Sequence, residues 1–181
     1  MNGRILVGCI GNIFLGDDGF GVEVARRLAG RELPEYVEVA DFGIRGLDLV
    51  YALQEDYGAV ILVDALPRGG EPGTVYLIEP EIEAEGEVEL DTHSMDPVKA
   101  IRFARAMGAE PVRTLVVGCE PGVVLEGESY EDVLVELSQP VQAAVEEAVE
   151  LVESLVEQID ATNVERECQA GRSKGKGGEP A

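Results

Sequence analysis

Basic residues are scarce in this chain of 181 residues, which has 14 Lys and Arg against 36 Asp and Glu. The resulting formal net charge is −22. A field of that sign repels nucleic-acid backbones and anionic membrane surfaces, so we expect neither as a partner. It is compatible with cations, metal sites and basic protein partners.

Cysteines and long apolar stretches are also few. Cys9, Cys119 and Cys168 are far apart and form no CxxC pair, which excludes a zinc ribbon and a disulfide framework. We therefore expect a reducing, cytoplasmic compartment. No stretch reaches the roughly 20 apolar residues of a membrane span. The N-terminus also lacks the basic region and long apolar core of a signal peptide.

Short apolar runs alternate with helical patterns along the first 158 residues. The runs predict strands at 4–10, 36–42, 59–63, 73–78 and 114–118. Apolar residues at helical spacing predict helices at 20–29, 47–53, 97–105 and 139–158. This alternation indicates an α/β fold with a mostly parallel sheet.

The last part of the chain has a different composition. Residues 160–181 are rich in glycine and charge and poor in large apolar residues, which predicts a disordered tail. We therefore expect a single α/β domain over residues 1–159. The segment 79–91 holds seven acidic residues in thirteen and is predicted to be mostly a surface loop.

Three places near predicted strand ends carry side chains that can bind metals. Asp17 and Asp18 follow the first strand, Asp64 ends the most apolar strand, and His93 is the one histidine of the chain. Ligands of parallel sheets gather beyond the carboxyl ends of the strands. Two carboxylates and an imidazole suit a divalent transition metal such as nickel, zinc or copper. Carboxylates alone would suit magnesium or calcium.

Each of these residues also has a purely structural interpretation. Asp17 or Asp18 could cap the helix that follows, and the residues alone do not say which of the two would bind a metal. Asp64 could bind loop amides, and a lone His93 could be a surface or hydrogen-bonded residue. Cys9 is expected in the core, whereas Cys119 could line a cleft or pack as a small apolar residue.

Two other chemistries are disfavoured. Gly8, Gly11 and Gly16 lie between a strand and a helix, but their spacing fits neither a dinucleotide fingerprint nor a P-loop. Two aspartates also open the helix where a phosphate would have to bind. A serine or cysteine nucleophile lacks a G-x-S-x-G elbow and would have to share the single histidine.

At these residues the chain resembles the NiFe hydrogenase maturation endopeptidases over about residues 4–158. The resemblance rests on an ordered set of short motifs: Gly11-Asn12, Asp17-Asp18-Gly19-Phe20-Gly21-Val22, Asp41-Phe42-Gly43-Ile44-Arg45-Gly46, Asp64-Ala65, Pro72-Gly73-Thr74, Thr92-His93-Ser94 and Val117-Gly118-Cys119-Glu120-Pro121. It implies a three-layer sandwich whose twisted, mainly parallel sheet has helices on both faces.

The resemblance also implies an activity. Enzymes of this family remove a C-terminal extension from the large-subunit precursor of a NiFe hydrogenase after nickel has been inserted into it. Carried over by position, the three metal-contacting residues of the family fall on Asp18, Asp64 and His93. The first position is often Glu in the family, so Asp18 reaches one methylene less far. Gly43 and Gly46 match a loop that helps to hold the substrate tail.

The implied mechanism needs no metal owned by the protein. The three side chains would dock onto nickel held by the precursor, and zinc or cadmium could substitute in the site. The metal could activate the attacking water, or a carboxylate could be the general base. The alternative function is a non-enzymatic nickel-binding or delivery protein built on the same frame.

Overall fold

The structure is a computed structural model that describes residues 3–81, 97–110, 112–125 and 133–174, with side chains described to residue 162. Its centre is a five-stranded sheet with the order β2-β1-β3-β5-β4. These strands are β1 (Arg4–Ile10), β2 (Val37–Gly43), β3 (Tyr57–Ala65), β4 (Val75–Ile78) and β5 (Arg113–Cys119). Neighbouring strands are parallel except β4, which runs antiparallel to β5 at one edge.

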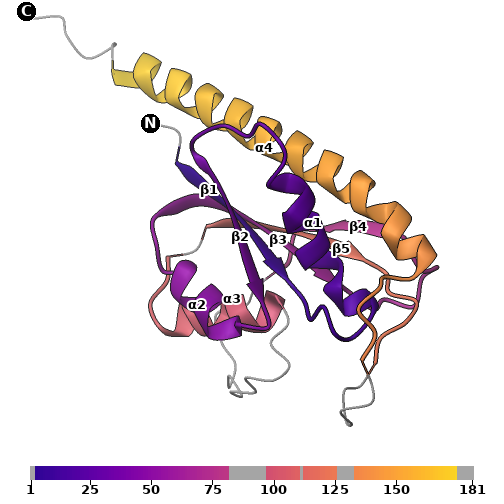
Figure 1. Cartoon of the computed structure of the whole chain (residues 1–181). Helices are drawn as coiled ribbons and strands as arrows, with labels where there is room; N and C mark the ends of the chain where they lie inside the picture. Colours follow the sequence, from indigo (N-terminus) through magenta and orange to yellow (C-terminus); the bar gives the residue numbers. More distant parts are fainter. Residues whose placement is uncertain (1–2, 82–96, 111, 126–132, 175–181) are drawn as a thin grey trace, which may run out of the picture.

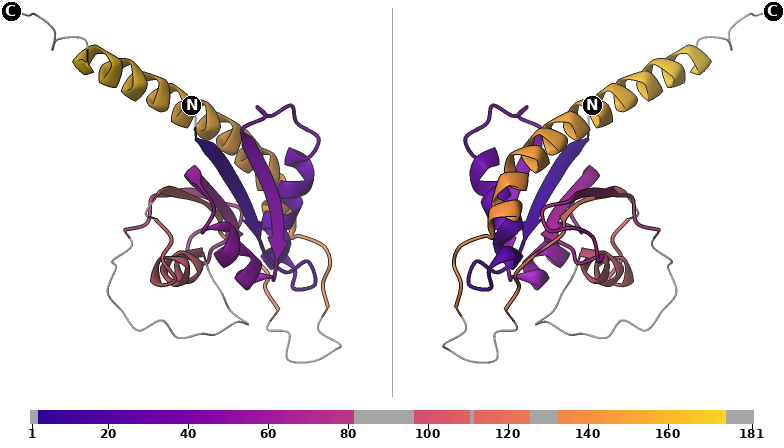
Figure 2. Two further views of the ribbon diagram at one scale, coloured as in Figure 1. Left: turned by 90° about the vertical axis from the view of Figure 1, so that its left-hand side faces the viewer. Right: turned by 90° about the vertical axis from the view of Figure 1, so that its right-hand side faces the viewer.

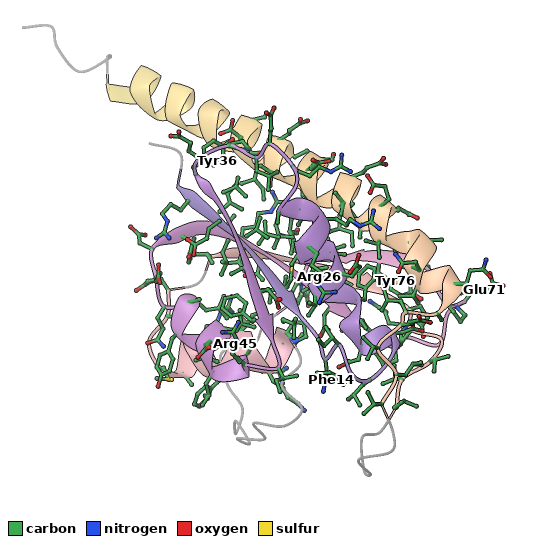
Figure 3. All side chains as sticks on the ribbon, in the orientation of Figure 1. Phe14, Arg26, Tyr36, Arg45, Glu71 and Tyr76 are labelled. Atoms are coloured by element: carbon green, nitrogen blue, oxygen red, sulfur yellow. The ribbon has the colours of Figure 1, made fainter. Side chains whose placement is uncertain are left out.

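Helices cover both faces of the sheet, which confirms the predicted three-layer α/β sandwich (Figures 1 and 2). One face is covered by α1 (Phe20–Leu28) and α4 (Gln139–Lys174). The other face is covered by α2 (Gly46–Ala52) and α3 (Pro97–Ala106). Figure 3 shows side chains filling the space between the sheet and both helix layers.

The continuous apolar runs of the three central strands follow from burial on both faces. Alternate residues of each strand belong to opposite cores. In β3, Ile61 and Val63 pack toward α1 and α4, whereas Val60 and Leu62 pack toward α2 and α3. By the same alternation, Asp64 faces the α2 and α3 side of the sheet.

Helix α4 is longer than the sequence predicted. Its buried stripe of Val141, Val145, Val149, Val152 and Val156 agrees with the predicted helical face. The helix nevertheless continues to Lys174, past residue 160 where the predicted disordered tail begins, and its end projects beyond the sheet (Figure 1). Residues 160–170 contain neither proline nor glycine, so an anchored helix propagates through them at little cost. Residues 175–181 lie outside the described part, and the domain boundary at 159 stays a prediction.

The parallel register places the carboxyl ends of the central strands side by side. Cys9 of β1 pairs with Val63 of β3, and Asp64 pairs with Gly118 of β5. The loops that follow β1, β2 and β3 therefore meet at one edge of the sheet. The predicted acidic loop at 79–91 lies outside the described residues beyond Glu81. In the part of the chain that the structure describes, no helix has the length and apolarity to cross a bilayer.

Candidate active site at the carboxyl edge of the sheet

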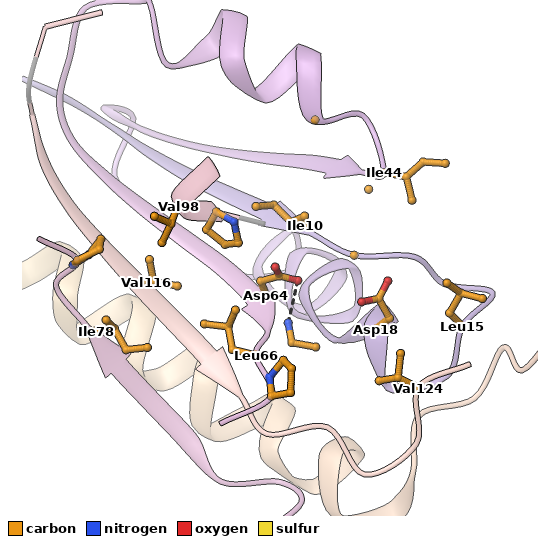
Figure 4. A pocket seen from close by; sticks show the side chains of 17 residues that line it. Ile10, Leu15, Asp18, Ile44, Asp64, Leu66, Ile78, Val98, Val116 and Val124 are labelled. Carbon is orange, nitrogen blue, oxygen red and sulfur yellow. Dashed lines mark hydrogen bonds between the residues drawn. The ribbon is translucent and has the colours of Figure 1, made fainter. Parts of the chain in front are cut away.

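A cavity of about 610 Å³ opens at this edge, between the strand ends and the α2 and α3 layer (Figure 4). Its lining is mostly apolar and includes the carboxylates of Asp18 and Asp64. Among the lining residues that the structure describes, no side chain is basic. The cavity therefore favours a cation flanked by apolar groups. Other lining residues include Ile10, Leu15, Ile44, Leu66, Val98, Val116 and Val124.

Asp64 reaches the cavity because it lies next to the last residue of β3, on the face that points toward α2 and α3. It is 7% exposed, and the backbone N–H of Ala65 donates to its Oδ1 at 2.8 Å. The bond to this amide orients the carboxylate, and the group still lines the cavity. The sequence analysis treated binding of a loop amide and a place in the site as alternatives for Asp64. In the structure Asp64 does both.

Asp18 lies in a 3-10 turn, Asp17–Gly19, that leads into α1. The backbone N–H of Asn12 donates to its Oδ2 at 2.9 Å, and the half-buried carboxylate lines the cavity. Burial raises the pKa of Asp18 above its ordinary value, against the opposing effect of the hydrogen bond from Asn12. Asp18 is thus a carboxylate held in the site at an electrostatic cost.

Asp17 has a different environment from its neighbour. Its side chain is completely buried and accepts hydrogen bonds from the segments around Gly122 and Ser138. This settles the geometric ambiguity between the two residues, because Asp18 lines the cavity and Asp17 does not. The alternative interpretation, that one of them caps the helix, is wrong. Neither the 3-10 turn nor α1 has a side-chain cap, and the cap positions are held by Gly16 and Gly19.

Two glycines allow the start of α1 to approach the strand ends. A Cβ on Gly21 would lie 2.1 Å from the carbonyl oxygen of Ile10 and 2.6 Å from that of Val63. Gly11 has a φ of +145°, and a Cβ there would lie 2.0 Å from the carbonyl oxygen of Asp18. These contacts bring the turn that carries Asp18 against β1 and β3. The close approach explains why this stretch of the sequence is rich in glycine.

The loop after β2 forms another wall of the cavity. Gly43 and Gly46, for which the family resemblance implies a contact with the substrate tail, both line it together with Ile44. Gly43 has a φ of +53°, and its N–H donates to Oδ1 of Asp41 at 2.9 Å. This local turn directs the chain from β2 into α2. The location suits the predicted contact with substrate, and the role of the two glycines stays a prediction.

His93 lies outside the described residues. The structure therefore brings together two members of the predicted trio, Asp18 and Asp64, and leaves the contribution of His93 a prediction. The described helix α3 begins at Pro97, and Pro97 and Val98 line the cavity.

Residues 22–155 match the family model of the hydrogenase maturation proteases. The chain belongs to this family. A protein of Methanocaldococcus jannaschii, provisionally named as a hydrogenase maturation protease, is 34% identical over 152 residues, which are 82% of this chain and 92% of that protein. The hydrogenase 2 maturation protease of Escherichia coli is 28% identical over 167 residues, covering 91% and 98%.

Solved structures agree with this assignment. The hydrogenase maturating endopeptidase HybD from E. coli aligns with a TM-score of 0.67 and 28% identity, over 86% of this chain and 93% of that one. The HycI protease from Thermococcus kodakarensis aligns with a TM-score of 0.62 and 25% identity, over 85% and 92%. The protein is thus an endopeptidase of the hydrogenase maturation family, acting on hydrogenase precursors.

Sequence reasoning assigned no role to Glu120, which follows β5 in this protease. The side chain is 5% exposed and accepts hydrogen bonds from the backbone N–H groups of Arg68 at 2.8 Å and Gly69 at 3.1 Å. The Tyr76 hydroxyl donates to it at 2.9 Å. Burial acts to raise the pKa of Glu120, but these hydrogen bonds outweigh it and hold the pKa below the ordinary value. A glutamate directly after a buried strand was the signal available in the sequence.

The cysteines near the protease site belong to the core. Cys9 and Cys119 are both fully buried and lie in the apolar cluster between the sheet and α1 and α4. Cys9 is in the core as predicted. Of the two interpretations of Cys119, packing is the one that the structure supports. Burial raises the pKa of the Cys119 thiol to about 12, with a smaller contribution from the charge of Asp17. A thiolate nucleophile is therefore disfavoured here.

Proposed function

We propose that this protease removes the C-terminal extension of a NiFe hydrogenase large-subunit precursor and recognises nickel held by that precursor. Asp18, Asp64 and His93 would contact the metal. The observation that carries the proposal is the meeting of Asp18 and Asp64, from separate strand–loop junctions, in one cavity with otherwise mostly apolar walls. Family membership supplies the class of substrate.

The donor set of the cavity fits a divalent metal delivered by the substrate. Carboxylates are acceptable ligands for such ions, and an imidazole from His93 would favour nickel or zinc over magnesium. Docking onto the precursor's metal would hold the scissile peptide close to the carboxylates, which is a proximity effect. Zinc or cadmium in the precursor should support the same docking to the degree that they accept the same ligands.

Two carboxylates in one cavity allow a division of labour. We propose that one of them accepts the proton of the attacking water as general base while the other helps to hold the metal. A metal bound there would polarise the scissile carbonyl or lower the pKa of the water.

The direct test mixes the purified protease with nickel-loaded precursor and follows the precursor by intact-mass spectrometry. We expect a mass loss equal to a C-terminal peptide, and no loss from a metal-free precursor. Metal transfer without a mass change would support a nickel carrier instead. Asp18→Asn, Asp64→Asn and His93→Ala should block cleavage, whereas Glu55→Gln, an exposed substitution at the opposite end of the sheet, should not.

We propose that processing takes place in the cytoplasm. Buried, unpaired thiols at Cys9 and Cys119 are compatible with a reducing compartment. Fractionation of cells, with the protease detected by antibody, tests this location. Recovery in an extracytoplasmic fraction would contradict it.

A further inference from the structure

We infer that Asp17 is a positioning residue for the protease site, which holds Asp18 and one wall of the cavity in place by joining three separate segments of the chain. The link to catalysis rests on the proposed function, whereas the link to the geometry of Asp18 does not. The inference starts from a carboxylate that has no exposed surface and no place in the cavity, yet directly precedes a residue that does.

The carboxylate of Asp17 receives four hydrogen bonds. Its Oδ2 accepts from the backbone N–H of Gly122 at 2.8 Å, from that of Val123 at 2.7 Å and from the Ser138 hydroxyl at 2.8 Å. Its Oδ1 accepts from the backbone N–H of Ser138 at 2.6 Å. A buried carboxylate is stable when its charge is met by donors in this number.

The backbone around Asp17 joins the same segments. The N–H of Asp17 donates to the carbonyl of Val123 at 2.8 Å, and the N–H of Gly16 donates to that of Leu134 at 2.7 Å. The N–H of Leu134 in turn donates to the carbonyl of Phe14 at 2.9 Å. The loop before α1, the segment after β5 and the segment before α4 thus form one connected unit, and the Asp17 carboxylate lies within it.

Two residues of the cavity depend on this unit. Asp18 follows Asp17 in the same tight turn, so a shift of one backbone moves the other. Val124, on the segment that Asp17 binds, also lines the cavity. The N–H of Asn12 reports on the turn, because it donates both to the Asp18 carboxylate at 2.9 Å and to the Asp18 carbonyl at 3.2 Å.

An amide at position 17 cannot reproduce these contacts. Asparagine offers one acceptor oxygen and a donor NH₂ group, whereas all four partners of Asp17 are donors. At least one pair of donors would face each other at hydrogen-bond distance. The segments would separate to relieve this conflict, and Asp18 would move with them. A displacement near 1 Å can reduce catalysis on the order of 10²-fold.

The test compares Asp17→Asn with Ser138→Ala, which removes the hydroxyl bond and keeps the backbone bond. Val149→Ala serves as the control, because it opens a cavity under α4 without touching these loops. Two quantities are measured for each folded variant: the amide chemical shift of Asn12, and kcat and KM for nickel-loaded precursor. We expect the largest Asn12 shift and a kcat loss on the order of 10²-fold for Asp17→Asn, and smaller changes for Ser138→Ala.

The control should lower the melting temperature and leave the Asn12 resonance and kcat close to wild type. Asp17→Asn behaving like Val149→Ala in both readouts would overturn the inference. If Asp17→Asn does not fold, an unchanged Asn12 shift in Ser138→Ala would overturn it. If the wild-type protein cleaves no precursor, the proposed function fails, and the Asn12 shift still decides whether Asp17 positions Asp18.

Discussion

Asp17 and Asp18 are adjacent in the sequence, yet their carboxylates have opposite environments. Asp17 is completely buried with four donors around it, and Asp18 is half-buried in the cavity with one backbone donor. The first stabilises the arrangement of loops. The second lines the cavity, where burial raises its pKa above the ordinary value. Burial of an acid therefore says little about its role until its hydrogen-bond donors are counted.

The same contrast recurs on the next two strands of the sheet. Asp64 lies next to the last residue of β3 and lines the cavity, whereas Glu120 follows the neighbouring β5 and binds the loop that comes after Asp64. We refer to Asp17 and Glu120 as the loop anchors and to Asp18 and Asp64 as the cavity pair. Each member of the cavity pair lies beside a loop organised by an anchor. The anchors thus hold the backbone next to each member of the cavity pair.

The largest expected effect comes from neutralising the cavity pair. Asp18→Asn and Asp64→Asn should each lower the rate of precursor cleavage on the order of 10²-fold or more, because the pair supplies the general base and a ligand to the metal. Because burial disfavours the charged form of Asp18, its neutral variant should keep or raise the melting temperature. Cleavage assays and calorimetry on the same samples check both effects. A variant that loses stability and activity together would place Asp18 among the anchors.

The next prediction concerns the close contact between the start of α1 and the ends of β1 and β3, which places Asp18 in the cavity. Gly21→Ala should destabilise the fold by about 3 kcal/mol, the upper end of the usual cost of overpacking, because the new Cβ meets two backbone carbonyls that no side-chain rotation can relieve. Gly30→Ala is the matched control, since its Cβ would lie 3.5 Å from the nearest neighbour. Chemical denaturation of both variants measures the difference. Similar stabilities would mean that α1 is free to withdraw from the sheet.

Much of the fold was predictable because burial on both faces leaves a strong pattern in the sequence. The first strand, 4–10, and the buried stripe of the last helix are examples, since each follows from apolar runs or spacing. The end of α4 was not, because the glycines of residues 160–181 all lie at position 171 or later, so the average composition of the segment hid a stretch that can continue the helix. The position of Asp64 at the end of a predicted strand was enough to identify it as a candidate site residue. For the second carboxylate, position alone left two candidates, Asp17 and Asp18.

The division of roles between those neighbours could not be predicted from sequence. Asp17 and Asp18 have the same side chain in the same turn, so composition and spacing treat them alike. The difference arises from donors on distant segments, Gly122 and Ser138, which only the fold brings near Asp17. Glu120 was missed for the same reason, because its partners lie on the loop after β3.

A smaller effect tests whether Glu120 is an anchor. Its pKa in the folded protein lies below the ordinary value of 4.5, so the stabilisation it gives is fully present above that pH. The stabilisation is lost as the pH falls through the lowered pKa. Glu120→Gln should therefore melt below wild type at neutral pH, with a gap that narrows below roughly pH 4. Thermal melts across this range measure the gap.

The control for this test is Glu79→Gln, which removes an exposed ion pair with Arg113. Exposed pairs contribute little, so its melting temperature should stay near wild type throughout. A gap for Glu120→Gln that is the same at acid and neutral pH would show that its charge is not what stabilises the loop.

The smallest expected effect is on the solvent access of the two buried cysteines, which reports local opening of the segments that Asp17 joins. Cys119 directly precedes Glu120, is fully buried, and has a thiol pKa raised to about 12 by burial and, to a lesser degree, by the charge of Asp17. We expect Cys119 and Cys9 to resist a thiol reagent in the native protein at pH 8 and to react together on unfolding, because both lie in one core cluster. Mass spectrometry of peptides from timed labelling measures each rate.

In Asp17→Asn the rate of labelling at Cys119 should rise while that at Cys9 stays low, since the opened segments adjoin the end of β5. Equal acceleration of labelling at both cysteines would mean that the substitution destabilises the whole core. Asp17 would then contribute to overall stability and would not specifically hold the loops around the cavity.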